Sequence, residues 1–253
     1  MVYPVWLAGF ALLFWIAERV RPWRKQKLFR AGLLQDVFYI VFNAHFFGML
    51  VGIATAGWLR SFPSYAPVAL HLMEAKPFWL QLVVLFVVFD FLKYCIHNLL
   101  HRVPWLWRFH KVHHSVVEMD WIGNWRYHWV EQVVYDSLLY VPLAFLGFSQ
   151  QAMFWNGVLA TFFGHYAHAN VRLGLGPLRY VFNSPQMHIW HHAHPDCGPT
   201  NKNFGISLSL WDWIFGTAYL PSQQPPKLGF AGIEQYPQNF FQQMIAPWRR
   251  FGH

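Results

Sequence analysis

Long apolar runs alternate with short polar segments along most of this chain. The runs cover residues 3–17, about 33–57, about 78–96, 131–148 and 152–168. A helix needs about 20 apolar residues to cross a hydrocarbon core that is about 30 Å thick. The first three runs therefore predict membrane-spanning helices. The last two are barely long enough and are separated only by Gly147–Gln151, so they predict a helical hairpin that crosses fully or dips partway.

The first run is predicted to stay in the protein as a span. A secretory signal carries its positive charges before the apolar core and a small-residue cleavage site after it. Here the basic residues follow the run, between Arg19 and Arg30, and no such cleavage site is present. We therefore expect residues 1–75 to contribute N-terminal spans to a single integral membrane domain that covers residues 1–253.

The distribution of lysine and arginine predicts how the spans are oriented. Six of the 19 basic residues lie between Arg19 and Arg30, which places that loop in the cytoplasm by the positive-inside rule. Alternating spans then place residues 58–77 outside, and that loop holds only Arg60 and Lys76. The predicted fold is an all-α, multi-pass membrane bundle whose remaining polar segments face the cytoplasm.

Composition supports a membrane protein and argues against a nucleic-acid-binding one. The chain is 55% hydrophobic and only 12% charged, whereas soluble domains average about 25% charged residues. The net charge is +8, but the basic residues follow the topological rule rather than forming a groove-binding stripe. Two cysteines, Cys95 and Cys197, are too few for an iron–sulfur site. No Gly-rich dinucleotide fingerprint is present, so the chain shows no sign of carrying an electron source of its own.

Two copies of one histidine pattern indicate the chemistry. His110-x-x-His113-His114 and His188-x-x-His191-His192 share the same spacing, which should arise by chance about 0.05 times in a chain with this many histidines. Residues three and four apart share one face of a helix, so each copy is a row of converging imidazoles. Together with His97 and His101 they make eight nitrogens, which are too many for one tetrahedral ion and suit two metal ions.

Asp90 and His97 extend this pattern into the third apolar run. Asp90, Tyr94, His97 and His101 are spaced by four, three and four residues, which places them on one helical face. A carboxylate within a span is costly and usually functional. We therefore expect Asp90 to accept the second ring N–H of a ligating imidazole, with an ion pair to Lys93 as the alternative. His128, and His168 at the inner end of the last run, are candidate further ligands, with a span-ending polar residue as the alternative for His168.

The histidine-bearing segments resemble the sterol desaturase/fatty acid hydroxylase superfamily of membrane di-iron oxygenases. The resemblance rests on Asp90–Ser115 (DFLKYCIHNLLHRVPWLWRFHKVHHS) and on Asn183–Thr217 (NSPQMHIWHHAHPDCGPTNKNFGISLSLWDWIFGT), the latter with its Asn-Phe-Gly, Trp-Asp and Phe-Gly-Thr elements. Arg126-x-His128 with Glu131, and His165/His168 with Asn170, are similar to the family's intermediate ligand regions. The match covers roughly residues 80–220, which would form the catalytic region.

Carried over residue by residue, the resemblance implies a set of iron ligands. The ligands it implies are His97, His101, His110, His113, His114, His188, His191 and His192, with His128 and His168 as further ligands. Two positions depart from the family pattern: Asn98 stands where Arg usually follows the first histidine, and Trp129 where Pro usually follows the histidine of the fourth region. Both neighbour the site, so they bear on substrate fit more than on metal binding.

The resemblance implies an enzyme that uses two iron ions and O₂ to hydroxylate or desaturate a lipid, such as a sterol or a fatty acyl chain. Its electrons would come from a donor of the ferredoxin, cytochrome b5 or reductase type. Zinc is a possible substitute in purified protein, because imidazole also suits zinc. Two other functions stay open at this stage: a metal-dependent membrane lipid hydrolase, and a non-enzymatic membrane protein that stores or carries metal.

Overall fold

The structure, a computed structural model, describes residues 3–48, 50 and 71–249. Every regular element in these residues is helical, and extended residues pair only in isolated bridges such as the one between Phe182 and Leu208. The predicted all-α class is therefore confirmed for the described part of the chain.

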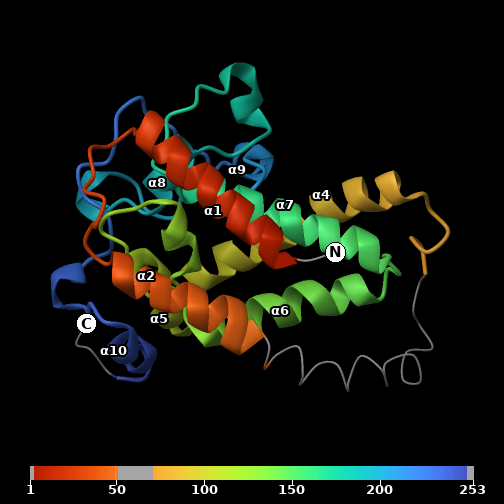
Figure 1. Cartoon of the computed structure of the whole chain (residues 1–253), viewed down its shortest axis with the longest axis horizontal. Helices are drawn as coiled ribbons and strands as arrows, with labels where there is room; N and C mark the ends of the chain where they lie inside the picture. Colours follow the sequence, from red (N-terminus) through yellow and green to blue (C-terminus); the bar gives the residue numbers. More distant parts are fainter. Residues whose placement is uncertain (1–2, 49, 51–70, 250–253) are drawn as a thin grey trace.

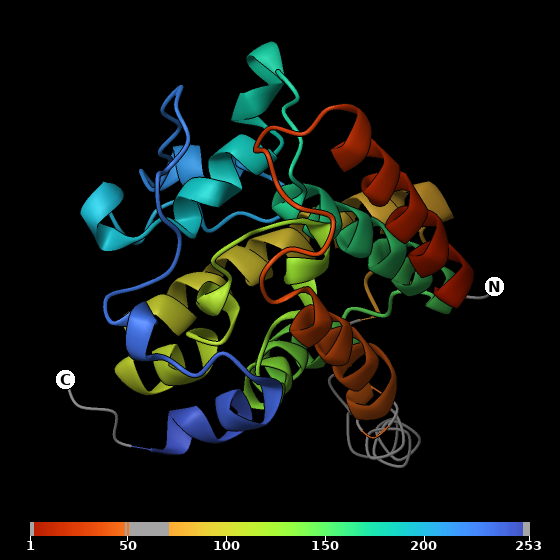
Figure 2. The ribbon, with the colours of Figure 1, turned by 60° about the vertical axis from the view of Figure 1, so that its left-hand side comes forward.

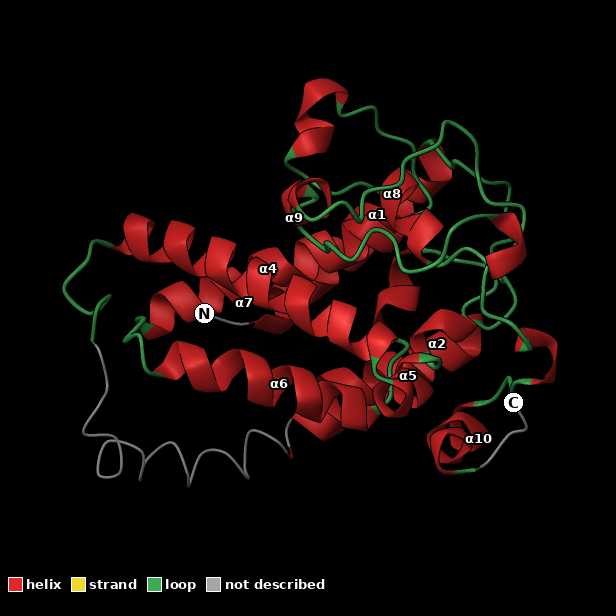
Figure 3. Cartoon of the chain, turned by 180° about the vertical axis from the view of Figure 1, so that it is seen from behind, coloured by secondary structure: helices red, strands yellow, loops and turns green. Residues whose placement is uncertain are grey.

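Three long helices form the body of the molecule: α4 (Phe78–Arg102), α6 (Trp129–Ala144) and α7 (Gln150–His168) (Figures 1 and 3). The predicted hairpin is present, because α6 and α7 run antiparallel and are joined by a short turn. The apolar layer between the helices contains Leu85 and Leu100 from α4 and Leu139 and Leu143 from α6. Fully burying one leucine contributes about 1.5–3 kcal/mol relative to leaving it exposed, so this apolar layer fixes how the three helices lie.

The N-terminal helices cover the outside of this body. Helix α1 (Tyr3–Val20) lies along α7, where Phe14 packs against Tyr166. Helix α2 (Leu33–Ile40) continues into a π-helical stretch, Val41–Phe47. The second predicted run is thus helical in all of its described residues, the last of which is Leu50. Residue 49, the rest of that run from residue 51, and most of the predicted outside loop at 58–77 lie outside the described residues.

Two of the described helices, α1 and α4, are long and apolar enough to cross a membrane. Both expose large apolar side chains, including Leu12 and Trp15 on α1 and Trp79 and Val83 on α4. Helix α6 has only 16 residues, and α7 carries several polar residues in its 19, so neither meets the same length and composition. The predicted spans in the hairpin and the predicted orientation therefore remain predictions.

Short helices gather at the end of the body where α4 and α7 stop and α6 starts (Figure 3): α5 (Pro104–His110), α8 (Pro185–His191), α9 (Leu210–Ile214) and α10 (Phe240–Ile245). Pro104 at the first position of α5 ends α4, since proline cannot continue a helix. Ser184 caps α8 by accepting a hydrogen bond from the Met187 N–H, and Pro185 takes the first helical position. These breaks turn all the histidine-bearing segments toward the same end.

The segment between α1 and α2 runs along this end of the body (Figure 2), and a buried ion network ties it there. Asp36 accepts hydrogen bonds from Arg30 Nη2 at 2.6 Å and from Arg126 Nε at 2.5 Å. Arg30 also donates to Asp120, and Arg126 also donates to the Ser115 carbonyl. A buried charge is stable only when it is paired, so these residues hold the basic segment firmly against the chain that follows α5.

Candidate metal centre

The structure brings nine of the ten predicted ligands together in two groups. The first group contains His97, His101, His110, His114 and His191, and the second contains His113, His168, His188 and His192. Within each group one ring nitrogen from every residue lies within 4.8 Å of the others. Eight of the nine side chains are buried, and His101 is half-buried. A two-centre arrangement follows from the fold of this one chain.

Each repeated histidine pattern divides its members between the two groups. Residues i and i+4 of a helix point in nearly the same direction, whereas residue i+3 points about 100° away from i+4. His110 and His114 accordingly join the first group while His113 joins the second. In the other copy, His188 and His192 join the second group while His191 joins the first. The pattern thus links two neighbouring centres rather than filling one.

In the second group the ring Nε2 atoms point their lone pairs toward one another. The Nδ1 atoms of His113 and His168 lie 3.1 Å and 2.9 Å from the carbonyl oxygens of Arg126 and Gly164. A carbonyl oxygen can only accept, so each Nδ1 carries the hydrogen and each Nε2 presents a lone pair. These two Nε2 atoms are 3.2 Å apart, and His188 Nε2 is 3.2 Å from that of His168. Lone pairs so close repel unless a cation lies between them.

The first group also combines Nδ1 atoms that donate to carbonyls with Nε2 atoms that present free lone pairs. His97 Nδ1 donates to the Phe204 carbonyl at 2.8 Å, and His191 Nδ1 donates to the Lys202 carbonyl at 2.8 Å. The Nε2 atom of His97 is left as a lone pair 3.2 Å from His110 Nε2. The Nε2 atom of His191 is buried without a hydrogen-bond partner. Neutral imidazoles whose free nitrogens converge are the ligands that zinc, copper and iron accept in proteins, so both groups fit a metal ion.

Burial keeps these imidazoles neutral. It lowers the pKa of His110 to about 3 and the pKa of His113 to about 4, and neighbouring histidines add to the effect on His113. Burial also lowers the pKa of His188, His191 and His192 well below the ordinary histidine value. A metal ion binds the neutral form, so the site needs no proton to leave before it can bind at neutral pH.

Glu131 is the carboxylate that supports the centre. Its Oε1 accepts a hydrogen bond from His110 Nδ1 at 2.9 Å, and its Oε2 is buried without a partner. A carboxylate at this position fixes the ring and makes the other nitrogen a stronger ligand. A sign of this role was available in the sequence, since Glu131 is an acidic residue at the start of an apolar run.

The expectation for Asp90 is wrong. Its carboxylate accepts hydrogen bonds from the backbone N–H groups of Ser207 and Leu208 and from Trp211 Nε1, at 3.0–3.1 Å, and it contacts no imidazole. The alternative, an ion pair with Lys93, is absent among the described residues as well. Asp90 instead anchors the segment before α9 to α4, so it positions the backbone that surrounds the first group.

His128 is the predicted ligand that the structure leaves outside both groups. Its Nδ1 accepts the Val130 N–H at 3.1 Å as the N-cap of α6, and its Nε2 donates to the Met244 carbonyl at 3.1 Å. Both ring nitrogens are therefore already used. His165 is also outside, since it donates to the Thr161 carbonyl and accepts from Trp125 Nε1.

The segment 202–217, which contains α9, supplies backbone acceptors to the first group from the loop that precedes the helix. Asp212 holds this loop by accepting the N–H groups of Phe204 and Gly205, each at 2.8 Å, and the Thr217 hydroxyl at 2.6 Å. This shape fixes the carbonyls that orient His97 and His191. The Asn-Phe-Gly, Trp-Asp and Phe-Gly-Thr elements therefore form one structural unit beside the centre.

Replacing Gly205 with alanine is expected to distort this loop. A Cβ atom at this position would lie 2.2 Å from the Leu208 carbonyl oxygen and 2.8 Å from an Asp212 carboxylate oxygen. Overpacking of this kind costs about 1–3 kcal/mol, so the thermal midpoint of the purified protein should fall. Gly9→Ala is the matched control, because its Cβ would meet nothing within 4 Å and α1 should tolerate it. Equal midpoints for the two variants would show that the loop has room to adjust.

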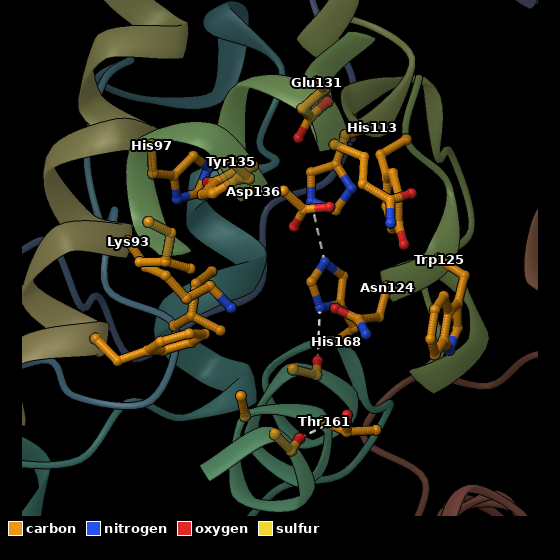
Figure 4. Close-up of a pocket in the computed structure, with 18 of the residues that line it drawn as sticks. Lys93, His97, His113, Asn124, Trp125, Glu131, Tyr135, Asp136, Thr161 and His168 are labelled. Atoms are coloured by element: carbon orange, nitrogen blue, oxygen red, sulfur yellow. Dashed lines mark hydrogen bonds between the residues drawn. The ribbon is translucent and has the colours of Figure 1, made fainter. Parts of the chain in front are cut away.

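A cavity of about 390 Å³ opens beside both groups, between α4, α6 and α7 (Figure 4). His97 and His110 of the first group and His113 and His168 of the second line its wall, together with Glu131. A volume of this size is typical of small-molecule sites. A bound molecule can therefore reach the face where the two groups meet.

Comparisons with known proteins agree with this geometry. Residues 82–217 match the fatty acid hydroxylase family. The chain is 33% identical over 177 residues to "Ornithine lipid hydroxylase OlsE" of Rhizobium tropici, which covers 70% of this chain and 53% of that protein. It is 25% identical over 202 residues to "Alkylglycerol monooxygenase" of Xenopus tropicalis, covering 76% of this chain and 40% of that protein. No solved structure matches the chain significantly.

A third relative shows that the similarity extends to another activity. "Very-long-chain aldehyde decarbonylase GL1-6" of Oryza sativa subsp. japonica is 28% identical over 140 residues, covering 51% of this chain and 21% of that protein. The chain thus spans about half or less of the length of these curated relatives. The matched region contains every histidine of the two groups.

Proposed function

Since this chain belongs to the fatty acid hydroxylase family, we propose that it is a membrane-bound, metal-dependent oxygenase that hydroxylates a lipid. The observation that carries this proposal is the pairing of imidazole lone pairs in two adjacent groups, because only cations make such contacts favourable. Two of the relatives are named as a lipid hydroxylase and a monooxygenase, which agrees with an oxidative role.

We assign one iron ion to each group. The first would be held by members of the first group, and the second by His113, His168, His188 and His192. Iron bound by protein ligands activates O₂ for attack on C–H bonds that are otherwise unreactive. Electrons would come from a ferredoxin, a cytochrome b5 or a reductase. The chain's own residues orient the ligands, through Glu131 and the carbonyls around the centre, and keep the site dry.

The membrane placement follows from the apolar helices. α1 and α4 expose large apolar side chains and are long enough to cross a bilayer, so we propose that lipid surrounds them. We propose that the histidine-bearing end faces the cytoplasm, because basic residues lie near that end and the positive-inside rule favours the cytoplasmic side for them. A lipid could then enter the cavity from the membrane while a soluble donor approaches from the cytoplasm.

Growth of producing cells under labelled O₂ tests the proposal. A lipid that is heavier by one labelled oxygen atom should appear in cells with the chain and be absent from cells with the His113→Asn variant. Desaturation would instead give a lipid lighter by two hydrogens and carrying no label. A lipid hydrolase would release fragments without needing O₂, and a metal store would leave the lipids unchanged. Identical lipid profiles from producing and non-producing cells would refute the oxygenase.

A further inference from the structure

The first histidine group reaches the surface at one edge. His101 is half-buried, whereas the other eight residues of the two groups are buried. Trp107 of α5 lies against this edge, with its ring centre 4.8 Å from that of His101 and 5.2 Å from that of His114. Trp107 is also half-buried, and α5 lies at the histidine-bearing end of the body (Figure 3). A molecule bound on this surface can therefore touch a ring that contacts two candidate ligands.

Two basic residues lie beside Trp107 on the same segment. Lys111 follows Trp107 by four positions, so the two are neighbours on the helical surface. Lys111 Nζ is 5.3 Å from the centre of the Phe230 ring, and that ring is 6.2 Å from the Trp107 ring. Burial, followed by the positive charge of the exposed Arg108, lowers the pKa of Lys111. Two positive charges that act on each other therefore lie next to the Trp107 ring.

A third cation, Lys202, borders the same edge of the first group. Asn201, the residue before it, hydrogen-bonds to His101 through its side chain. The Lys202 carbonyl oxygen accepts the hydrogen bond from His191 Nδ1, and its Nζ donates to the Gly216 carbonyl at 3.1 Å. We call the surface formed by Trp107, Arg108, Lys111 and Lys202 the basic face.

No acidic residue balances the basic face from within its own segments. Residues 91–117 and 197–211 contain no aspartate or glutamate. In the part of the chain that the structure describes, no salt bridge includes any of the three cations. Glu234, four residues after Phe230, is paired with Lys227. The basic face is therefore complementary to a surface that carries carboxylates.

The basic block at Arg19–Arg30 is the alternative surface for such a partner, and it fits less well. Arg30 is paired with Asp36 and Asp120, so part of the charge of the block is already neutralised. The block also follows α1 directly, and basic residues at the end of a span meet the anionic lipid surface. The basic face instead adjoins the ligand rings.

We propose that the basic face docks a small acidic electron-carrier protein and that electrons enter the first group through Trp107. This inference rests on the proposed function and names where its electron donor binds. The carrier gives up one electron at each encounter, and the first group is where that electron arrives. Two encounters supply two electrons, which together with O₂ and two protons from the solvent turn one C–H bond into C–OH and release one water.

Contact between rings favours this route. Electron transfer through protein weakens steeply as the gap between donor and acceptor grows, and ring centres as close as those of Trp107, His101 and His114 are in contact. The cavity between α4, α6 and α7 also reaches the two groups, but in the proposed placement a lipid enters it from the membrane. A soluble carrier therefore approaches the centre from the basic face.

Binding of an oxidised carrier tests docking without electron flow. A plant-type 2Fe–2S ferredoxin, which is an acidic carrier, is titrated against the purified holoprotein in nanodiscs of zwitterionic lipid. Arg108→Glu/Lys202→Glu should bind it at least about tenfold more weakly than the wild type, because steering by complementary charge is replaced by repulsion. Lys111→Gln should also weaken binding, and the wild-type affinity should fall as salt is raised.

Lys25→Glu/Lys27→Glu is the matched control, since it makes the same change in net charge at exposed positions of the basic block. It should weaken binding much less, and all these variants should retain their bound metal. A control that weakens binding as much as Arg108→Glu/Lys202→Glu would overturn the basic face as the docking site. So would an absence of binding at low salt, or an affinity that does not depend on salt.

Reduction of the bound iron by pre-reduced ferredoxin, followed by stopped-flow absorbance without O₂, tests the route. At saturating ferredoxin, Trp107→Leu should slow this reduction by at least about tenfold while its iron content stays that of the wild type. Trp107→Phe keeps an aromatic ring and should restore most of the rate. Trp105→Leu, which changes an exposed tryptophan of the same helix, is the control. An unchanged rate in Trp107→Leu, or iron that takes up no electron, would overturn the route.

Failure of this inference and failure of the proposed function give different results. Labelled lipid in cells, together with ferredoxin binding that ignores Arg108 and Lys202, would overturn the docking site and leave the oxygenase standing. Charge-dependent docking on the basic face without any labelled lipid would overturn the oxygenase and keep the docking site.

Discussion

Replacing His113 with asparagine is expected to remove most of the bound iron from the second group and to lower lipid oxidation by more than about a hundredfold. Changes that only disturb a ligand's orientation already cost about 10–100-fold in metal affinity or activity, and this change removes the ligand itself. His113 also lies between the two groups, with its ring 5.3 Å from that of His110 and 4.7 Å from that of His192. Elemental analysis of the purified protein and product formation in cells measure the two effects.

His128→Asn is the matched control for that variant. His128 is a buried histidine like His113, but its ring nitrogens bond to Val130 N–H and to the Met244 carbonyl. Asparagine is a good N-cap, so α6 should still form in this variant. The protein should keep its bound iron and lose only part of its stability. If His128→Asn lost as much iron as His113→Asn, the assignment of ligands to the two groups would be wrong.

The repeated histidine spacing predicted most residues of the metal site, because helical periodicity decides which side chains converge. His110, His113 and His114 are close in sequence, so a single helical segment places all three at the centre. The same reasoning could not show that the segment serves two groups. That division depends on where α8 crosses the segment, which is a property of the tertiary packing.

The roles of Asp90 and His128 could not be read from sequence spacing. A carboxylate inside an apolar run signals that it has partners, but those of Asp90 lie more than 110 residues away, in a loop with no regular structure. His128 sits beside a charged residue in a family-like motif, yet its place at the start of α6 commits it to capping. In both cases the local pattern correctly indicated a residue that matters for the structure, but it could not indicate which groups that residue contacts.

The fold shows the same limit. The apolar runs predicted α1, α4 and the α6–α7 hairpin, because each buries or exposes apolar surface along its own length. The loop at 202–209, just before α9, has no periodic pattern, and its shape comes from hydrogen bonds to Asp212 and from the close approach at Gly205. The basic block at Arg19–Arg30 was predicted as a loop, but Arg30 is buried against Asp36 and Asp120.

The metal-free protein is expected to be destabilised by mild acid. Burial lowers the pKa of His110 to about 3 and that of His113 to about 4, whereas an unfolded histidine titrates near 6.5. The unfolded chain therefore binds more protons in this range, so the stability that these groups contribute is complete above about pH 6.5 and is lost as the pH falls toward 4. Lowering the pH from about 7 to 5 reduces the free energy of unfolding by about 2 kcal/mol for each of these two groups. Together they should lower the thermal midpoint by about 10 °C.

Metal binding should raise the midpoint at every pH in this range without removing the acid sensitivity. The buried imidazoles take no proton between pH 7 and pH 5 with or without a metal ion, so the difference in bound protons between the unfolded and folded states is the same for both forms. Thermal denaturation in detergent at a series of pH values, with and without a chelator, measures both curves. In the chelated His113→Asn variant one titrating group is gone, so its midpoint should fall less steeply between pH 7 and pH 5 than that of the chelated wild type. A metal-free midpoint that does not change over this range would mean that the buried imidazoles are open to protonation in the folded state.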